Sequence, residues 1–131
     1  MLTEKDYCDY DTCVALIELG FVGISPIVYT GKGKAIERVS RGLLITPRVA
    51  NANGWVLGIH LYEAQKWLRE EKNMAIVICP YSYNYETETR TWSYEIWIGD
   101  NFEEERNCLQ SYEEALLEGI KEAIKILKEE K

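Results

Sequence analysis

The sequence predicts an α+β fold in which an antiparallel sheet of about four strands is covered by three helices, in the order α-β-β-α-β-β-α. Three segments place apolar residues at the spacing of a helix that buries one face, and other segments alternate with the period of two typical of strands. Turn-forming residues join neighbouring strand segments, which favours hairpins and therefore an antiparallel sheet.

The first helix is predicted over about residues 10–19. Apolar residues recur at helical spacing from Cys13 to Phe21, as expected for one buried face. Asp9 is the expected N-cap, and Gly20 stands where a left-handed residue commonly ends a helix.

Two strands are predicted between the first and second helices. Residues 25–30 (SPIVYT) are rich in β-branched and aromatic residues, and residues 42–46 (GLLIT) form the second apolar run. The sequence leaves open whether residues 35–40 (AIERVS) belong to this hairpin. Residues 47–54 (PRVANANG) have the composition of a turn, and residues 55–59 are expected to extend toward the next helix.

A second amphipathic helix is predicted over residues 61–73, followed by a hairpin. Residues 74–79 (MAIVIC) are a short, continuous apolar run, which predicts a central strand buried on both faces. Residues 81–85 and 92–98 alternate with period two. The polar residues 86–90 (ETETR) between them predict the closing turn of an antiparallel hairpin.

The last predicted element is a long helix that begins at a capping box. Ser111 and Glu114 are spaced so that each side chain can accept a hydrogen bond from the other residue's backbone N–H. Apolar residues recur at helical spacing from Tyr112 to Leu127, and lysines gather in the last turn, where they complement the helix dipole.

Length and composition predict one domain over residues 1–131 that folds without a cofactor or a structural metal. Hydrophobic residues make up 47% and charged residues 28%, which are ordinary values for a globular protein. The first residues lack the pattern of a secretory signal, and the apolar runs are far shorter than the roughly 20 residues of a spanning helix. We therefore expect a soluble, cytoplasmic protein with no membrane partner.

The acidic residues are concentrated in the second half of the chain. Residues 1–60 contain six basic and six acidic residues, whereas residues 61–131 contain nine and sixteen and so carry the whole net charge of -7. Such a surface repels polyanions, which argues against direct nucleic-acid binding and favours a basic partner.

The candidate reactive residues form no recognisable catalytic or metal-binding motif. His60 is the only histidine, and capping or packing is its expected role. Residues 31–34 (GKGK) lack the spacing of a phosphate-binding loop, and residues 103–105 (three glutamates) are expected in a solvated loop. The cysteines lack the paired spacing of a zinc site and are expected as reduced thiols. They are Cys8, Cys13, Cys79 and Cys108.

The aromatic residues of the hairpin predict a protein-binding surface. Stacking of single-stranded nucleic acid or carbohydrate is an alternative, but the surrounding acidic residues are unfavourable for phosphate. Cover by a helix, which buries the rings, is the usual outcome for such a sheet face, and the sequence leaves open which rings remain exposed as a protein-binding surface. The residues proposed for the surface are Tyr83, Tyr85, Trp92, Tyr94 and Trp97.

Four segments carry a resemblance: YCDYDTCVALIELGF, YEAQKWLREEKNMAIVI, the tyrosine-rich hairpin and SYEEALLEGIKEAIKIL. In order and spacing they resemble a set of small uncharacterised proteins carried by phages and mobile elements of gut bacteria. Asp9 replaces the serine that usually follows Tyr-Cys in this set, Lys72 replaces a histidine, and His60-Leu61 stands in place of a Pro-Thr pair. The shared residues are caps and core positions, so the resemblance implies an origin and a fold and no activity.

Three functions follow as hypotheses. The first is a noncatalytic accessory protein of a phage or mobile element that binds another protein, with a host protein as the expected partner. The second is an acidic mimic of nucleic acid that occupies a basic DNA-binding protein. The third is a small enzyme whose pocket gathers His60, a cysteine and carboxylates from distant segments. The sequence does not predict an oligomeric state.

Overall fold

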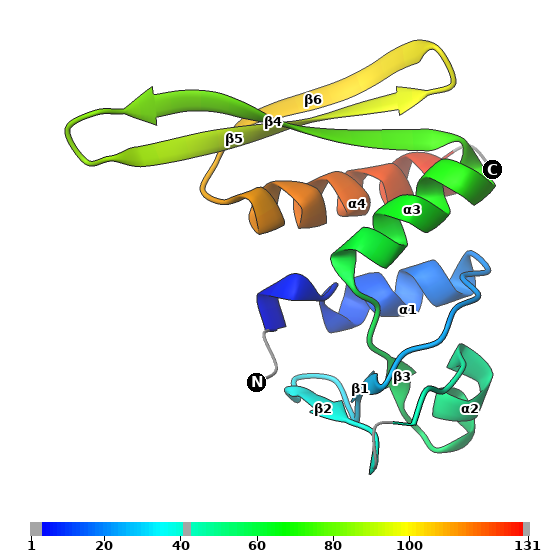
Figure 1. Cartoon of the computed structure of the whole chain (residues 1–131). Coiled ribbons are helices and arrows are strands. Elements are labelled where there is room, and N and C mark those ends of the chain that lie inside the picture. Colours follow the sequence, from blue (N-terminus) through cyan, green and yellow to red (C-terminus); the bar gives the residue numbers. More distant parts are fainter. Residues whose placement is uncertain (1–3, 41–42, 130–131) are drawn as a thin grey trace. The chain divides into compact units, whose positions relative to one another are not determined.

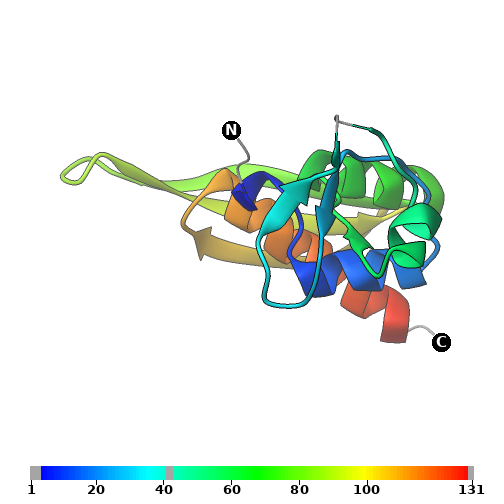
Figure 2. The same cartoon turned by 90° about the horizontal axis from the view of Figure 1, so that it is seen from below.

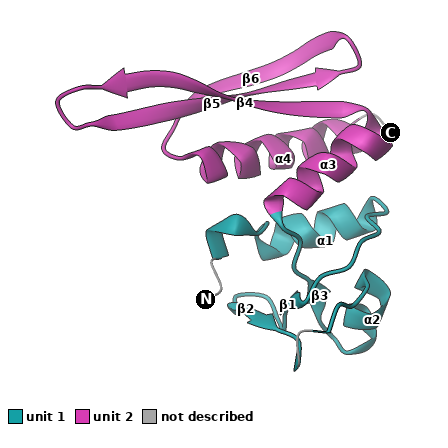
Figure 3. Cartoon of the chain, in the orientation of Figure 1, with its two compact units in different colours: residues 1–60 teal, residues 61–131 magenta. Residues whose placement is uncertain are grey.

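The chain divides into two units, Met1–His60 and Leu61–Lys131 (Figure 3). The computed structural model describes residues 4–40 and 43–129. Each unit contains helices and a three-stranded antiparallel sheet, so the α+β class is confirmed. The predicted single sheet and element order are wrong, because the described elements run α-β-β-α-β-α-β-β-β-α after a short 3-10 helix. That residues 1–131 fold as one domain stays a prediction.

In the part of the first unit that the structure describes, there are two α-helices and three short strands (Figure 1). Its sheet has the order β2-β1-β3, with both pairs antiparallel. The elements are the 3-10 helix η1 (Glu4–Asp6), α1 (Tyr10–Glu18), β1 (Ile27–Tyr29), β2 (Ile36–Arg38), α2 (Pro47–Ala52) and β3 (Val56–Leu57).

Helix α1 has the predicted ends. Asp9 is the N-cap, and its Oδ1 accepts a hydrogen bond from the backbone N–H of Thr12 at 2.9 Å. At the other end Gly20 has φ +105°, a conformation that favours glycine. The backbone N–H of Phe21 donates to the carbonyl of Leu16 at 3.0 Å, which completes the expected C-terminal motif.

The second strand of this unit is not the one that we predicted. Strand β2 pairs Ile36 with Tyr29, and its single buried residue, Ile36, lies next to the exposed Glu37 and Arg38. In the predicted strand over residues 42–46, Ile45 forms only an isolated bridge with Ser25, and residue 42 lies outside the described residues. Residues 36–38 are closer in sequence to β1 than residues 42–46 are, and the turn at residues 31–34 brings them beside it. They therefore form the strand that pairs with β1.

Residues 47–54 contain helix α2 rather than only a turn. Thr46 is the N-cap, with Oγ1 accepting from the backbone N–H of Val49 at 3.2 Å, and Pro47 occupies the first turn, where its missing N–H costs nothing. Ala50 is completely buried. Pro47, which we placed in a turn, therefore begins a helix.

Hydrogen bonds among distant segments converge on Cys8 in the first unit. The backbone N–H of Cys8 donates to the carbonyl of Ile59 at 2.8 Å, and the Tyr29 hydroxyl donates to the carbonyl of Cys8 at 2.6 Å. The backbone N–H of Ile59 in turn donates to Cys13 Sγ at 3.4 Å. These bonds tie the start of the chain to β1 and to the residues after β3.

The second unit is a three-stranded meander with two helices on one face (Figure 1). Its strands lie in the order β4-β5-β6, so β5 is central and the predicted central strand, β4, is an edge. The predicted solvated loop at residues 103–105 is also wrong, because these glutamates belong to β6. The elements are α3 (Leu61–Lys72), β4 (Met74–Asn84), β5 (Thr89–Ile98), β6 (Asn101–Leu109) and α4 (Tyr112–Glu129).

Helix α4 packs directly on the sheet at Gly119. A Cβ at this position would lie 2.8 Å from Ile76 Cγ2 and 3.3 Å from Tyr94 Cγ, so only glycine allows this close approach. One half of the predicted capping box is present, since the backbone N–H of Glu114 donates to Ser111 Oγ at 3.0 Å. The Glu114 carboxylate accepts instead from the backbone N–H of Gln110 at 3.3 Å.

Candidate protein-binding site

The far part of the β4–β5 hairpin extends past the third strand. The pairing of β5 with β6 ends at Trp92 opposite Leu109, whereas β4 and β5 continue to pair as far as Asn84 opposite Thr89. Among the described residues, residues 81–91 therefore pair only with one another. We call this two-stranded ribbon the arm; Figure 2 shows it from below.

The tip of the arm is formed by local hydrogen bonds. Asn84 Oδ1 accepts from the backbone N–H groups of Glu86 at 2.9 Å and Thr87 at 3.3 Å, a turn that asparagine side chains commonly support. Glu88 has φ 54° and completes the reversal. The hydroxyls of Ser82 and Thr91, 2.6 Å apart, join the two strands nearer the base.

Aromatic rings project from the arm into solvent. Tyr85 is 85% exposed and Tyr81 is 51% exposed. The rings of Tyr83 and Tyr85 meet edge to face with centroids 4.8 Å apart, and the Arg90 guanidinium lies 5.3 Å from the Tyr83 centroid. The two contacts hold Tyr83 between a ring and a cation, so its orientation is restrained before any partner binds.

The five residues of the predicted surface lie in four environments. Tyr83 and Tyr85 are on the arm, and Trp92 packs at its base against Tyr112, with ring centroids 5.4 Å apart. Tyr94 is 3% exposed and faces α4, and its burial raises the pKa of its hydroxyl. Trp97 lies on the opposite sheet face, where its Nε1 donates to Glu95 at 3.1 Å.

Two residues of the arm were not part of the predicted surface. Tyr81 sits in the register irregularity between Pro80 and Ser82, which exposes its ring. Arg90 stands opposite Tyr83 in the ladder and supplies the cation over its ring. Its position across the turn from a tyrosine is the sequence signal that could have identified it.

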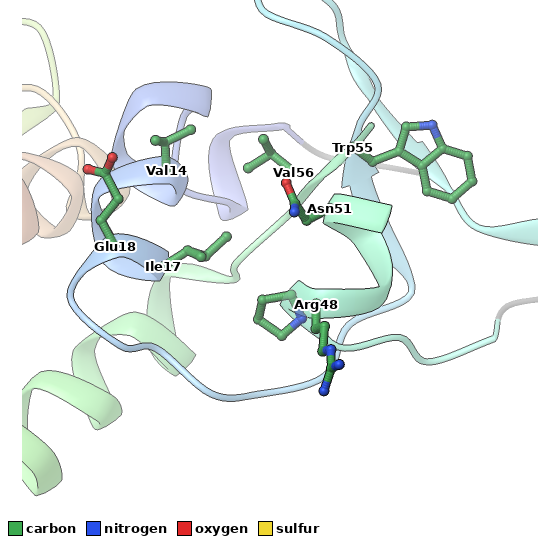
Figure 4. A pocket seen from close by; sticks show the side chains of 8 residues that line it. Val14, Ile17, Glu18, Arg48, Asn51, Trp55 and Val56 are labelled. Atoms are coloured by element: carbon green, nitrogen blue, oxygen red, sulfur yellow. The ribbon is translucent and has the colours of Figure 1, made fainter. Parts of the chain in front are cut away.

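A cavity of about 490 Å³ lies between α1 and α2 of the first unit (Figure 4). Val14 and Ile17 of α1 form one wall, and Val56 lies opposite. The charged side chains on its rim, Glu18 and Arg48, are exposed. The volume suits a small ligand, but the polar groups do not converge on one point. Neither His60 nor any cysteine lines this cavity.

The candidate reactive residues are engaged elsewhere. The ring of His60 contacts that of Tyr7, with centroids 5.2 Å apart. Cys8 and Cys13 are buried, and the hydrogen bond with Cys13, together with burial, raises the pKa of the Cys8 thiol well above its usual value. A thiol that stays protonated is a poor nucleophile. Within residues 4–40 and 43–129, no group of three or more His, Cys, Asp or Glu side chains could hold a metal ion.

The glycine-rich segment 31–34 lies in a turn. The backbone N–H of Lys34 donates to the carbonyl of Gly31 at 3.1 Å, and Gly33 has φ +79°. The side chain of Lys32 lies 3.9 Å from the exposed carboxylate of Asp11. The segment is therefore a turn whose lysine is directed at a neighbouring carboxylate, in agreement with the missing phosphate-loop spacing.

Comparison of the chain with known protein families, with curated proteins and with solved structures finds no match. In the described part of the chain, no helix combines the length and the apolar character needed to cross a membrane. The candidate site therefore rests on the geometry of the arm itself.

Proposed function

We propose that this protein is a noncatalytic binding protein that recognises another protein through the arm, residues 81–91. The observation that carries the proposal is the exposure of Tyr81, Tyr83 and Tyr85 on a two-stranded ribbon. Exposed aromatic rings gathered in one place are uncommon on a surface that contacts only water, and they are enriched in protein interfaces.

The composition of the arm suits recognition of a folded surface. Tyrosine supplies a large, rigid and amphipathic contact area with few rotatable bonds, and serine and asparagine supply adaptable hydrogen bonds. The arm, YSYNYETETRT, is built mainly from these residue types and threonine. The contacts of Tyr83 with Tyr85 and Arg90 restrain its ring in advance, which lowers the entropy lost on binding.

The charges of the arm favour a protein over a nucleic acid. Surfaces that stack nucleotide bases combine aromatic rings with a positively charged groove. The arm carries Glu86 and Glu88 against the single cation Arg90, and that cation already lies over Tyr83. A partner with basic residues around an apolar centre complements this pattern. A host protein is the partner class that follows if the chain comes from a phage or mobile element.

Site-specific crosslinking tests this proposal. A photoreactive phenylalanine derivative placed at Tyr85 should capture a partner, whereas the same derivative at Phe102, an exposed ring in β6 outside the arm, should not. With the captured partner purified, Tyr83→Ala/Tyr85→Ala should weaken binding by about tenfold or more, because central aromatic residues dominate interface energy. Phe102→Ala should leave the affinity within about twofold.

The crosslinking result also separates this proposal from its alternatives. Equal affinity of the wild type and the Tyr83→Ala/Tyr85→Ala variant for every captured partner would exclude the arm as the binding surface. A basic DNA-binding partner that DNA displaces, and whose binding is insensitive to the arm substitutions but lost at high salt, would instead support the acidic mimic.

A further inference from the structure

Among the described residues, one edge of β4 pairs with no other strand, and it carries a specific pattern of backbone groups. Ladder bonds alternate along an antiparallel strand, so every second residue directs its N–H and C=O away from the neighbouring strand. The backbone N–H of Gly99 donates to the carbonyl of Asn73 at 3.1 Å, which places odd-numbered residues of β4 toward β5. Gln65 Nε2 donates to the carbonyl of Ile76 at 2.8 Å, which confirms that even-numbered residues face outward.

Two groups are missing from this outward row. Pro80 has no N–H, and the carbonyl of Ile76 is already engaged by Gln65. Between residues 76 and 80, the remaining outward groups are the N–H of Ile76, both groups of Ile78 and the carbonyl of Pro80. Ile76, with its occupied carbonyl, and Pro80, with its missing N–H, each lie two residues from Ile78, on opposite sides of it.

We propose that a second copy of this chain pairs antiparallel with the β4 edge, with Ile78 opposite Ile78 of the second copy. The two Ile78 residues then exchange two hydrogen bonds, and each Ile76 N–H donates to the Pro80 carbonyl of the other copy. The missing donor of Pro80 falls opposite the occupied carbonyl of Ile76. Within residues 76–80 every outward group is then satisfied, and the two sheets form one sheet of six strands.

Other registers of the same pairing leave groups unsatisfied. A shift in one direction places Pro80, without its N–H, opposite the carbonyl of Ile78. A shift in the other direction places the occupied carbonyl of Ile76 opposite the N–H of Ile78. The irregularity between Pro80 and Ser82 ends the regular edge, so the pairing is confined to residues 76–80. The backbone pattern therefore selects a twofold arrangement centred on Ile78.

Charge distinguishes this edge from the other edge of the sheet. Met74–Asn84 contains no charged residue, whereas β6 carries Glu103, Glu104 and Glu105 in a row. Charged side chains are a common means of preventing edge-to-edge pairing. Self-association through β6 would bring glutamates of two copies together, and self-association through β4 brings no charged strand residues together.

An engineered disulfide tests the register. In the proposed pairing, Val77 lies directly opposite Cys79 of the second copy, at a position without backbone hydrogen bonds, where the Cα atoms of paired residues are about 4.5 Å apart. A disulfide fits this separation. Val77→Cys should therefore form a covalent dimer on mild oxidation, in a Cys108→Ser background that removes the exposed native thiol.

Matched variants make the result decisive. Phe102→Cys in the same background places an exposed thiol on the same sheet face at the other edge. The Val77→Cys protein should crosslink about tenfold faster, because pairing raises the local thiol concentration to the millimolar range. Adding Cys79→Ser should abolish the crosslink. Equal crosslinking rates for both edges, or a crosslink that persists without Cys79, would overturn the proposal.

The unmodified protein supplies an independent measurement. Sedimentation equilibrium should show the wild type reaching twice the monomer mass as its concentration rises, with Val77→Lys shifted toward monomer, since an edge lysine opposes pairing. Phe102→Lys should behave as the wild type. A wild type that remains monomeric at about 1 mM, where weak specific binding is already visible, would also overturn the proposal.

Discussion

Each of the two units of this chain is stabilised internally by a different kind of interaction. The first has strands of two or three residues, and its distant segments are joined by hydrogen bonds around Cys8 and Tyr29. The second has strands of 9 to 11 residues and an 18-residue helix that packs on them through apolar side chains. The first unit should therefore be sensitive to buried polar groups, and the second to side-chain volume.

The largest expected effect tests the apolar layer of the second unit. Ile96, in the central strand, is completely buried. Ile96→Ala should lower the free energy of unfolding by about 2–5 kcal/mol, because it removes buried methyl groups and leaves a cavity. Urea denaturation of the full chain measures the loss. Val77→Ala, on the exposed sheet face, should cost less than about 1 kcal/mol. Similar losses for both variants would show that the second unit does not depend on the volume of its buried side chains.

The next effect tests the hydrogen bonds of the first unit. Tyr29→Phe removes the donor that lies 2.6 Å from the Cys8 carbonyl while it keeps the ring. We expect a loss of about 1–3 kcal/mol at pH 8, since a buried acceptor loses a partner. Tyr10→Phe is the matched control, because its ring packs against that of Tyr29 with centroids 5.8 Å apart. No difference between the two variants would show that the hydroxyl is unimportant.

The difference in free energy of unfolding between the wild type and Tyr29→Phe should also depend on pH. Burial raises the pKa of Tyr29 above its usual value of about 10. The folded state favours the neutral phenol, so the contribution of Tyr29 is fully present below about pH 10 and falls as the pH rises further, by up to about 1.4 kcal/mol per unit. The gap between wild type and Tyr29→Phe should therefore narrow above pH 10. Tyr94 is present in both proteins, so its own titration cancels.

The smallest expected effect concerns the arm, which extends beyond the packed layers of the second unit. Tyr85→Ala should change the free energy of unfolding by less than about 0.5 kcal/mol, because the ring is exposed. The same urea denaturation checks this value. A loss of about 2 kcal/mol or more would mean that the arm contributes to folding rather than only to recognition.

Sequence reasoning predicted the second unit better than the first for a physical reason. The helices near residues 61–72 and 112–129, and the hairpin between them, are long enough to show a complete period of apolar residues. Helix α2 has six residues, too few for such a pattern, and its signal is the Thr46–Pro47 cap within turn-like composition. Strand β6 has three consecutive glutamates and no alternation, so only its pairing with β5 identifies it.

The candidate site was predictable only in outline. Alternation identified an aromatic hairpin, but it could not tell which residues of the hairpin extend beyond the helices. The position of α4 buries Tyr94 and covers Trp92, and the irregularity between Pro80 and Ser82 turns Tyr81 outward. These outcomes depend on contacts with residues far along the chain, which local patterns do not contain.

The separation of the arm from the packed layers has an evolutionary consequence. Most substitutions in a folded core destabilise the protein, and selection removes those that take it below the stability needed for function. Residues 81–91 are free of most of this constraint, since their side chains are mainly solvated. Their sequence can therefore drift rapidly among descendants, and specificity for a new target can arise while the scaffold that presents the ribbon is inherited unchanged.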